Sequence, residues 1–247
     1  MFLPRIIFIT HATSTIDYVR SAEIALEGGI RFIQYRHKPP ITDDVLRAEA
    51  KLIAELCRQY GAVFTVNDNV WLAREIGADG VHVGLTDMSV EQARLLMNAG
   101  SDGGNAGAPI NSGKPINAGA LMNVRDSAIV GGTANTFEDI SRHAEQGVSY
   151  VGLGPFRFTE TKKNLSPILG LSGYRDIVEQ CHKKNINTPI YAIGGIHTED
   201  IPALMKTGIY GIAVSSLILQ SENPITTARE TLNPQLFFAK NKQSVIK

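Results

Sequence analysis

A short polar segment between Val151 and Lys163 carries residue types suited to binding phosphate. It reads Val-Gly-Leu-Gly-Pro-Phe-Arg-Phe-Thr-Glu-Thr-Lys-Lys, with hydroxyls at Thr159 and Thr161 followed by two adjacent ammonium groups. Hydroxyls, backbone amides and ammonium groups are good partners for phosphate and diphosphate oxygens. Surface loops are often polar without any function, so the segment alone leaves an ordinary solvated loop as an equal alternative.

Other charged side chains follow other short apolar runs of the chain. Arg36 and Lys38 follow one run, and Asp68 and Asp87 follow the next two. Together with Lys162 the three cations suit a diphosphate, but the two carboxylates would repel it unless a metal cation lay between. Mg²⁺ takes one or two carboxylates together with phosphate oxygens and water. We therefore predict a Mg²⁺–diphosphate site, with simple ion pairing of the carboxylates as the alternative.

A second group of residues, near the end of the chain, predicts a separate phosphate site. Gly194 and Gly195 follow one apolar run, and Ser215 and Ser216 follow the next. Glycines let the backbone approach a phosphate closely, and serines add hydroxyls. A tight turn followed by a helix cap is the alternative. Two separate phosphate sites indicate a transferase that acts on two substrates.

The elements that position these residues alternate between strand-like and helix-like patterns. The strand-like runs cover residues 5–10, 30–36, 62–66, 80–84, 128–132, 148–153, 189–193 and 210–214. They are too apolar to be half exposed, which indicates a parallel sheet covered by helices. We predict one (β/α)8 barrel over residues 1–239, with a frayed tail at 240–247, whose strands would bring the predicted site residues to one end. A doubly wound sheet is the alternative, but residues 11–14 lack its glycine-rich fingerprint.

Helix starts and one interruption are also visible in the sequence. The expected N-terminal caps are Ser14 or Thr15, then Thr42, Ser89 with Gln92, and Thr136 with Asp139. A Gly- and Asn-rich stretch at about 98–123 predicts a flexible insertion between the fourth helix and the fifth strand. This connection lies opposite the catalytic end of a barrel, so its deletion is expected to leave the chemistry intact.

Composition argues against several kinds of partner. The 247 residues include 24 Lys and Arg and 24 Asp and Glu, so the formal net charge is zero and neither nucleic acid nor a membrane surface is an expected partner. Cys57 and Cys181 have no motif spacing and are expected to be buried thiols in a reducing compartment. Residues 2–10 lack a signal-peptide pattern, which predicts a cytoplasmic protein. His82 is expected to be a core histidine, and the six histidines form no metal motif.

The ordered motifs of this chain resemble the thiamine-phosphate synthase (thiamine-phosphate pyrophosphorylase) family. They are QYRHK at 34–38, VND at 66–68, GVHVG at 80–84 followed by Asp87, GLGPFRFTETKK at 152–163, AIGGI at 192–196, and the pair Ser215–Ser216. The resemblance extends over about residues 6–221. One of these motifs would be suggestive, whereas the complete set in this order is specific.

The resemblance implies that hydroxymethylpyrimidine diphosphate reacts with thiazole phosphate to give thiamine phosphate and diphosphate. It assigns the pyrimidine diphosphate to Gln34, Arg36, Lys38, Asn67, Thr133 and Lys162. It assigns Mg²⁺ to Asp68 and Asp87, and the thiazole phosphate to Thr159, Thr161, Gly195, Ser215 and Ser216. Arg36, Lys38 and Lys162 would be the catalytic cations, because negative charge develops on the departing diphosphate.

Two residues depart from the family pattern and keep other readings open. The family has Ser-x-His after the fifth strand, where this chain has Thr133 and Asn135. Threonine keeps the hydroxyl, but asparagine is not an acid or base near neutral pH. A thiazole tautomerase on the same barrel and a non-catalytic phosphometabolite binder are the rival functions. The presence of Asp68 and Asp87 and the absence of the histidine favour the synthase. The sequence is also compatible with a homo-oligomer.

Overall fold

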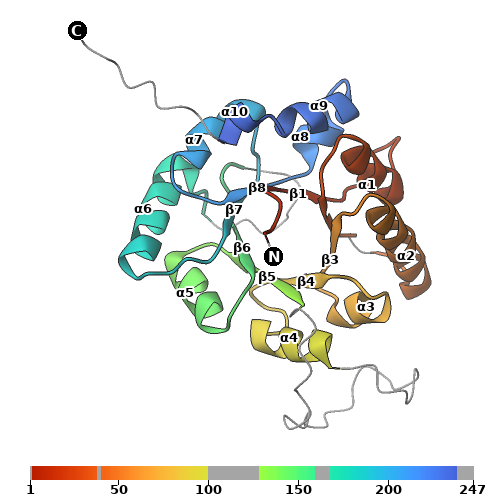
Figure 1. Cartoon of the computed structure of the whole chain (residues 1–247), viewed down its shortest axis with the longest axis horizontal. Coiled ribbons are helices and arrows are strands. Elements are labelled where there is room, and N and C mark those ends of the chain that lie inside the picture. Colours follow the sequence, from red (N-terminus) through yellow and green to blue (C-terminus); the bar gives the residue numbers. More distant parts are fainter. Residues whose placement is uncertain (1, 38–39, 100–127, 159–166, 238–247) are drawn as a thin grey trace.

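Eight parallel strands close into a barrel with helices around its outside (Figure 1). The computed structural model describes residues 2–37, 40–99, 128–158 and 167–237. The strands follow one another in chain order, and β1 pairs with β8 as well as with β2, which closes the sheet. The predicted (β/α)8 barrel is confirmed.

The strands are short, and each is followed by a helical connection. The strands are β1 (Ile6–Ile9), β2 (Phe32–Tyr35), β3 (Val63–Asn67), β4 (Gly80–Val83), β5 (Ile129–Ala134), β6 (Tyr150–Leu153), β7 (Ile190–Ile193) and β8 (Gly211–Val214). The described helices are α1 (Tyr18–Glu27), α2 (Asp43–Gln59), α3 (Val70–Glu75), α4 (Val90–Asn98), α5 (Phe137–Glu145), α6 (Gly170–Lys183), the 3₁₀ helix η2 (Thr198–Asp200), α7 (Ile201–Met205), α8 (Ser216–Leu219), α9 (Pro224–Thr231) and α10 (Pro234–Phe237).

The interior of the barrel is filled by large side chains. Alternate strand residues meet there in a cluster formed by Ile7, Phe32, Val63, Ile129, Tyr150, Tyr191 and Ala213. The ring of Tyr150 packs edge-on against Phe32 and Tyr191, with centroids 5.5 and 5.4 Å away. Gly131 makes room for it, because a Cβ there would lie 2.2 Å from Cζ of Tyr150. A packed interior confines ligand chemistry to the ends of the strands.

The other face of the strands packs under the helices. Residues such as Phe8, Ile33 and Val66 are buried there together with apolar side chains of the helices. Both cysteines lie in this layer as buried free thiols, which confirms their predicted burial. Burial raises the pKa of Cys57 to about 12, so its reactive thiolate form is disfavoured at neutral pH.

The capping residues define most helix starts as predicted. Thr42 caps α2, and Ser89 with Gln92 and Thr136 with Asp139 form capping boxes at α4 and α5. The predicted cap of the first helix at Ser14 or Thr15 is wrong. Asp17 caps α1 instead, because the hydroxyl of Thr13 accepts the amides of Thr15 and Ile16 and holds that stretch in a turn.

Other differences concern short elements near the carboxyl end. The connection after β7 consists of the short η2 followed directly by α7, with Pro202 in the first turn of α7. The helices α8 and α10 were not predicted, since four residues are too few to show a helical period. The strand β5 continues to Ala134, two residues beyond the predicted end, and therefore includes Thr133.

The predicted insertion and the predicted tail lie almost entirely outside the described residues. The chain leaves α4 at Asn98 and is described again from Ala128, whose amide donates to Oδ1 of Asn98 at 3.1 Å. Nη1 of Arg94 donates to the carbonyl of Ala128, also at 3.1 Å. These contacts join the flanks of the insertion at the amino end of β5, opposite the predicted catalytic end. Throughout the described ranges, no helix is long and apolar enough to cross a membrane.

Candidate active site

The predicted site residues that the structure describes lie at one end of the barrel. They are Gln34 and Arg36 at the end of β2, Asn67 and Asp68 at β3, Asp87 after β4, Thr133 in β5, Gly195 after β7, and Ser215 and Ser216 after β8. Since all eight strands are parallel, these positions share the carboxyl-end face. Lys38, Thr159, Thr161 and Lys162 lie outside the described residues.

Two amide side chains connect β2 with β3 at this face. Nε2 of Gln34 donates to Oδ1 of Asn67 at 2.8 Å, and Gln34 is 3 % exposed. The bond orients both amides across the boundary between neighbouring strands. Buried amides with fixed orientation are suited to recognising a polar ligand, because little side-chain freedom remains to be lost on binding.

The two predicted metal ligands converge above Gly84. Asp68 has a left-handed backbone with φ of 63°, and its amide donates to the carbonyl of His82 at 2.7 Å. Oδ2 of Asp87 accepts the amide of Gly84 at 2.8 Å. A Cβ on Gly84 would lie 2.6 Å from Oδ2 of Asp87 and 3.9 Å from Oδ1 of Asp68. Glycine thus keeps open the space that both carboxylates border.

This pair of carboxylates fits Mg²⁺ better than a fully protein-ligated metal. In the described part of the chain, no group of three or more His, Cys, Asp and Glu side chains is arranged to hold a metal ion. Mg²⁺ needs only one or two carboxylates, because substrate phosphates and water complete its shell. The donor set at Asp68 and Asp87 is therefore consistent with a Mg²⁺ ion that binds together with a phosphorylated substrate.

The backbone of Arg36 is fixed by the first strand. Its amide donates to Oγ1 of Thr10 at 2.9 Å, and the same hydroxyl donates to its carbonyl at 3.3 Å. Thr10 is buried, with 2 % of its surface exposed. One threonine therefore satisfies both backbone groups of Arg36 and fixes the position of its backbone at the end of the barrel.

The next residue, His37, is held between α1 and α2. Its ring stacks on Tyr18, with centroids 3.9 Å apart and 25° between the planes. Its Nδ1 lies 2.7 Å from Oε2 of Glu49, which also accepts the hydroxyl of Tyr35 at 2.7 Å. Burial, together with the bond to Glu49, raises the pKa of Tyr35 and keeps its hydroxyl protonated.

A buried chain of hydrogen bonds supports Thr133. Nε2 of His82 lies 3.1 Å from Oγ1 of Thr133, and Nδ1 lies 3.2 Å from the hydroxyl of Tyr150. His82 is 7 % exposed, which confirms the predicted core histidine. Asn135, in place of the family histidine, donates through Nδ2 to the carbonyl of Gly154. It thereby ties the end of β5 to the start of the loop after β6.

The opposite side of the face is built mainly from backbone and hydroxyls. Gly194 and Gly195 both have positive φ, 96° and 64°, which glycine adopts without strain. Ser215 precedes α8, and its Oγ is shielded from solvent without a hydrogen-bond partner among the described residues. An unsatisfied buried hydroxyl costs about 1–3 kcal/mol, so a ligand that bonds to it would recover that energy.

Several supporting residues could not be identified from the sequence. Thr10, Tyr18 and Glu49 come from distant positions, and so does Asp200, which pairs with Arg157 beside Gly195. No local spacing relates them to the residues that they support. Their shared signal is weak: each is a polar or aromatic residue that would be costly to bury without a partner.

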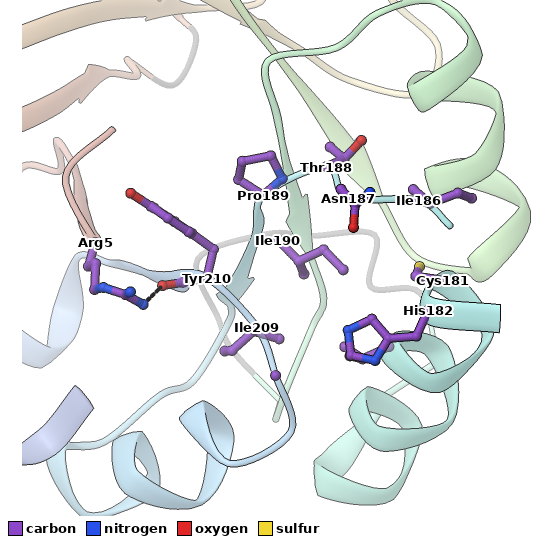
Figure 2. A pocket seen from close by; sticks show the side chains of 12 residues that line it. Arg5, Cys181, His182, Ile186, Asn187, Thr188, Pro189, Ile190, Ile209 and Tyr210 are labelled. Atoms are coloured by element: carbon purple, nitrogen blue, oxygen red, sulfur yellow. Dashed lines mark hydrogen bonds between the residues drawn. The ribbon is translucent and has the colours of Figure 1, made fainter. Parts of the chain in front are cut away.

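A cavity of about 330 Å³ lies at the other end of the barrel (Figure 2). It is lined by residues that precede strands, among them Arg5, Pro189 and Tyr210, and by Cys181 and His182 of α6. Nη1 of Arg5 donates to the carbonyl of Tyr210 at 2.8 Å, and its guanidinium lies over the Tyr210 ring. The cavity contains none of the predicted site residues, and the amino ends of barrel strands commonly serve stability.

The fold and the face just described define a (β/α)8 barrel with polar side chains gathered at the carboxyl ends of its strands, where enzymes with this fold carry their active sites. The model of the family "Thiamine monophosphate synthase" matches residues 6–101 and 115–218, and the chain belongs to this family. Membership of this family places the chain among the transferases of thiamine biosynthesis, which act on the substrates of thiamine-phosphate synthesis. The resemblance stated from the motifs is therefore confirmed.

Individual relatives agree with the family assignment. The thiamine-phosphate synthase of Phocaeicola vulgatus is 46 % identical over 226 residues, which cover 92 % of this chain and 95 % of the relative. That of Flavobacterium johnsoniae is 43 % identical over 232 residues, covering 93 % and 95 %. The solved thiamine phosphate pyrophosphorylase of Pyrococcus furiosus is 27 % identical, with a TM-score of 0.72 and coverage of 95 % and 96 %.

Proposed function

We propose that the chain catalyses the Mg²⁺-dependent transfer of hydroxymethylpyrimidine from its diphosphate to the ring nitrogen of thiazole phosphate. The products are thiamine phosphate and diphosphate. The observation that carries the metal-dependent part is the convergence of Asp68 and Asp87 on the open space at Gly84. Two carboxylates there would repel a diphosphate by themselves, so their presence beside a predicted diphosphate site supports a bridging cation.

The pyrimidine diphosphate would be held on the side formed by β2 to β5. Gln34 and Asn67 are already oriented by their mutual hydrogen bond, and the hydroxyl of Thr133 is supported by His82. Arg36, with the sequence-predicted Lys38 and Lys162, would supply positive charge to the diphosphate. Asp68 and Asp87 would hold a Mg²⁺ ion, whose positive charge would offset that of the diphosphate.

The thiazole phosphate would be held on the side formed by β6 to β8. Gly195 would present its backbone amide, and Ser215 and Ser216 their hydroxyls, with Thr159 and Thr161 added from the sequence. The Oγ of Ser215 has no hydrogen-bond partner among the residues that the structure describes, which supports a ligand at this position. Because a phosphate monoester is compact, backbone amides and hydroxyls are sufficient to bind it.

The reaction requires positioning and charge stabilisation, with no protein nucleophile. The bond between the pyrimidine methylene carbon and the diphosphate oxygen breaks, and its electron pair leaves with diphosphate. The electron-rich aminopyrimidine spreads the positive charge, and the lone pair of the thiazole nitrogen forms the new bond to carbon. Arg36, Lys38 and Lys162 would bind the departing oxygens more strongly as their charge grows, which is how they would accelerate the step.

The test is product formation from the two substrates while the Mg²⁺ concentration is varied. We expect thiamine phosphate and diphosphate in equal amounts, with a rate that rises with Mg²⁺ and is lost in a chelator. Folded wild-type protein that forms no thiamine phosphate at any Mg²⁺ concentration would contradict the transfer reaction. Full activity in the chelator would contradict the metal-dependent part alone.

A further inference from the structure

Arg157, in the loop after β6, pairs with Asp200, the last residue of η2. Nη1 of Arg157 lies 2.7 Å from Oδ2 of Asp200, and Nη2 lies 2.9 Å from Oδ1, which makes the ion pair bidentate. Nη1 also donates to the carbonyl of Gly195 at 2.7 Å. Asp200 accepts the amide of His197 at 2.8 Å as well. The fork of one arginine therefore spans a carboxylate and the peptide of Gly195.

The backbone holds the same two segments together. The amide of Phe156 donates to the carbonyl of Ile193 at 2.8 Å, and that of Arg157 donates to Gly194 at 3.0 Å. A Cβ on Gly195 would lie 2.8 Å from the carbonyl oxygen of Phe158 and 3.0 Å from Cβ of Arg157. The Gly195 peptide is thus enclosed on one side by the β6 loop and fixed at its carbonyl by a side chain.

The ion pair also explains why Arg157 is unsuited to be a phosphate ligand itself. The side chain of Asp200 is 13 % exposed and that of Arg157 is 43 % exposed. Burial opposes ionisation of Asp200, but hydrogen bonds from Arg157 and His197 outweigh it and hold the pKa of Asp200 below its ordinary value. Asp200 is therefore ionised at neutral pH and offsets the charge of Arg157.

We propose that Arg157 and Asp200 form a positioning pair that fixes the Gly195 peptide for the phosphate group of the second substrate. This inference rests on the proposed function, in which that phosphate belongs to the thiazole substrate. The pair acts through the carbonyl of Gly195, which fixes the peptide plane that follows the Gly195 amide and so limits rotation of this residue. Arginine suits this role, because its planar fork donates two parallel bonds to the carboxylate while one of the same nitrogens bonds to the carbonyl, and the ammonium of lysine does not reproduce this geometry.

The test compares Arg157→Lys and Asp200→Asn with wild type in steady-state kinetics, with each substrate varied in turn. We expect the KM for thiazole phosphate to rise about tenfold in both variants, because a slight displacement of a positioning group has effects of this order. The kcat and the KM for pyrimidine diphosphate should stay within about twofold. Arg58→Ala is the matched control, since Arg58 pairs with Glu55 on the exposed surface of α2 and should behave as wild type.

The outcomes separate this inference from the proposed function. An unchanged KM for thiazole phosphate in both variants overturns the positioning role, and so does an equal rise in the two KM values, which would indicate a general structural defect. If wild type forms no product, the proposed function fails instead. Calorimetric titration of thiazole phosphate into wild type and Arg157→Lys then tests the pair directly, and equal affinities overturn it.

Discussion

The two sides of the carboxyl-end face of the barrel carry different kinds of predicted ligand. On the side of β2 to β4, the predicted ligands are side chains: a guanidinium, two amides and two carboxylates. Gln34 bonds to Asn67, Thr10 fixes the backbone of Arg36, and Asp87 accepts the amide of Gly84. On the side of β6 to β8, the predicted ligands are a glycine peptide and serine hydroxyls, and the nearby Arg157 is already neutralised by Asp200. The side of β2 to β4 thus presents charged side chains as predicted ligands, whereas on the side of β6 to β8 the charge of Arg157 is compensated by Asp200.

The difference matches the two substrates of the proposed reaction. A diphosphate that leaves as an anion needs charge that stabilises it more in the transition state than in the ground state. A phosphate group that only anchors its substrate needs uniform binding, which amides and hydroxyls supply. Substitutions on the first side should therefore reduce kcat, whereas those on the second should raise the KM of one substrate.

The largest effect is expected for Asp87→Ala. Removing this carboxylate leaves Asp68 alone beside the diphosphate, so kcat/KM for pyrimidine diphosphate should fall about 10²- to 10³-fold. The rate should be measured over a range of Mg²⁺ concentrations. Asp44→Ala, which removes a carboxylate 99 % exposed on α2, is the control. A loss of the same size in both variants would contradict a specific role for Asp87.

Gly195→Ala should have the next largest effect. Its φ of +64° and the contact of its would-be Cβ with Phe158 both oppose alanine, so the KM for thiazole phosphate should rise about 10- to 100-fold. Gly147→Ala is a matched control, because Gly147 has a similar φ of +70° with nothing within 4 Å of its would-be Cβ.

Both glycine variants should lose about 1–2 kcal/mol of stability through the left-handed backbone, which thermal unfolding would measure. Only Gly195→Ala should change the KM for thiazole phosphate. A similar change in Gly147→Ala would show that global stability, and not the site, controls binding of this substrate.

His37→Ala should have a smaller effect, confined to the diphosphate side. It removes the stacking on Tyr18 and the bond to Glu49 that hold the residue next to Arg36. We expect kcat/KM for pyrimidine diphosphate to fall about tenfold, since Arg36 would be less well placed. The KM for thiazole phosphate should stay unchanged. His182→Ala, at an exposed position on α6, is the control. Equal losses of kcat/KM in the two variants would contradict a specific role for His37.

The smallest effect is expected in the pH dependence of stability. The pKa of Asp200 is lower in the folded state than its ordinary value near 4, so its contribution is present above that value and is lost as pH falls through the folded pKa. Asp200→Asn should lower Tm by a few degrees at pH 7 and by less below about pH 4. A Tm difference that grows on acidification would contradict this sign.

Much of the fold could be predicted because its determinants are local. The apolar strand runs and the caps at Thr42, Ser89 and Thr136 each act within a few residues. The first helix start failed for a local reason too: Thr13 forms a turn that competes with capping by Ser14 or Thr15.

The site could be predicted only in part. Residues at strand ends are found once the barrel is recognised, because the fold brings all carboxyl ends together. The partners that orient them are not, since Glu49 and Asp200 lie 12 and 43 residues from the side chains that they bind. Such pairings depend on helix placement around the barrel, for which the sequence shows no short-range pattern.

The claim that the two sides of the carboxyl-end face bind different substrates is tested most directly by calorimetry. Diphosphate with Mg²⁺, and separately thiazole phosphate, is titrated into wild type and Asp87→Ala. The account predicts that Asp87→Ala loses Mg²⁺-dependent binding of diphosphate and binds thiazole phosphate as wild type does. Equal diphosphate affinities in the two proteins, or a parallel loss of both ligands, would contradict it.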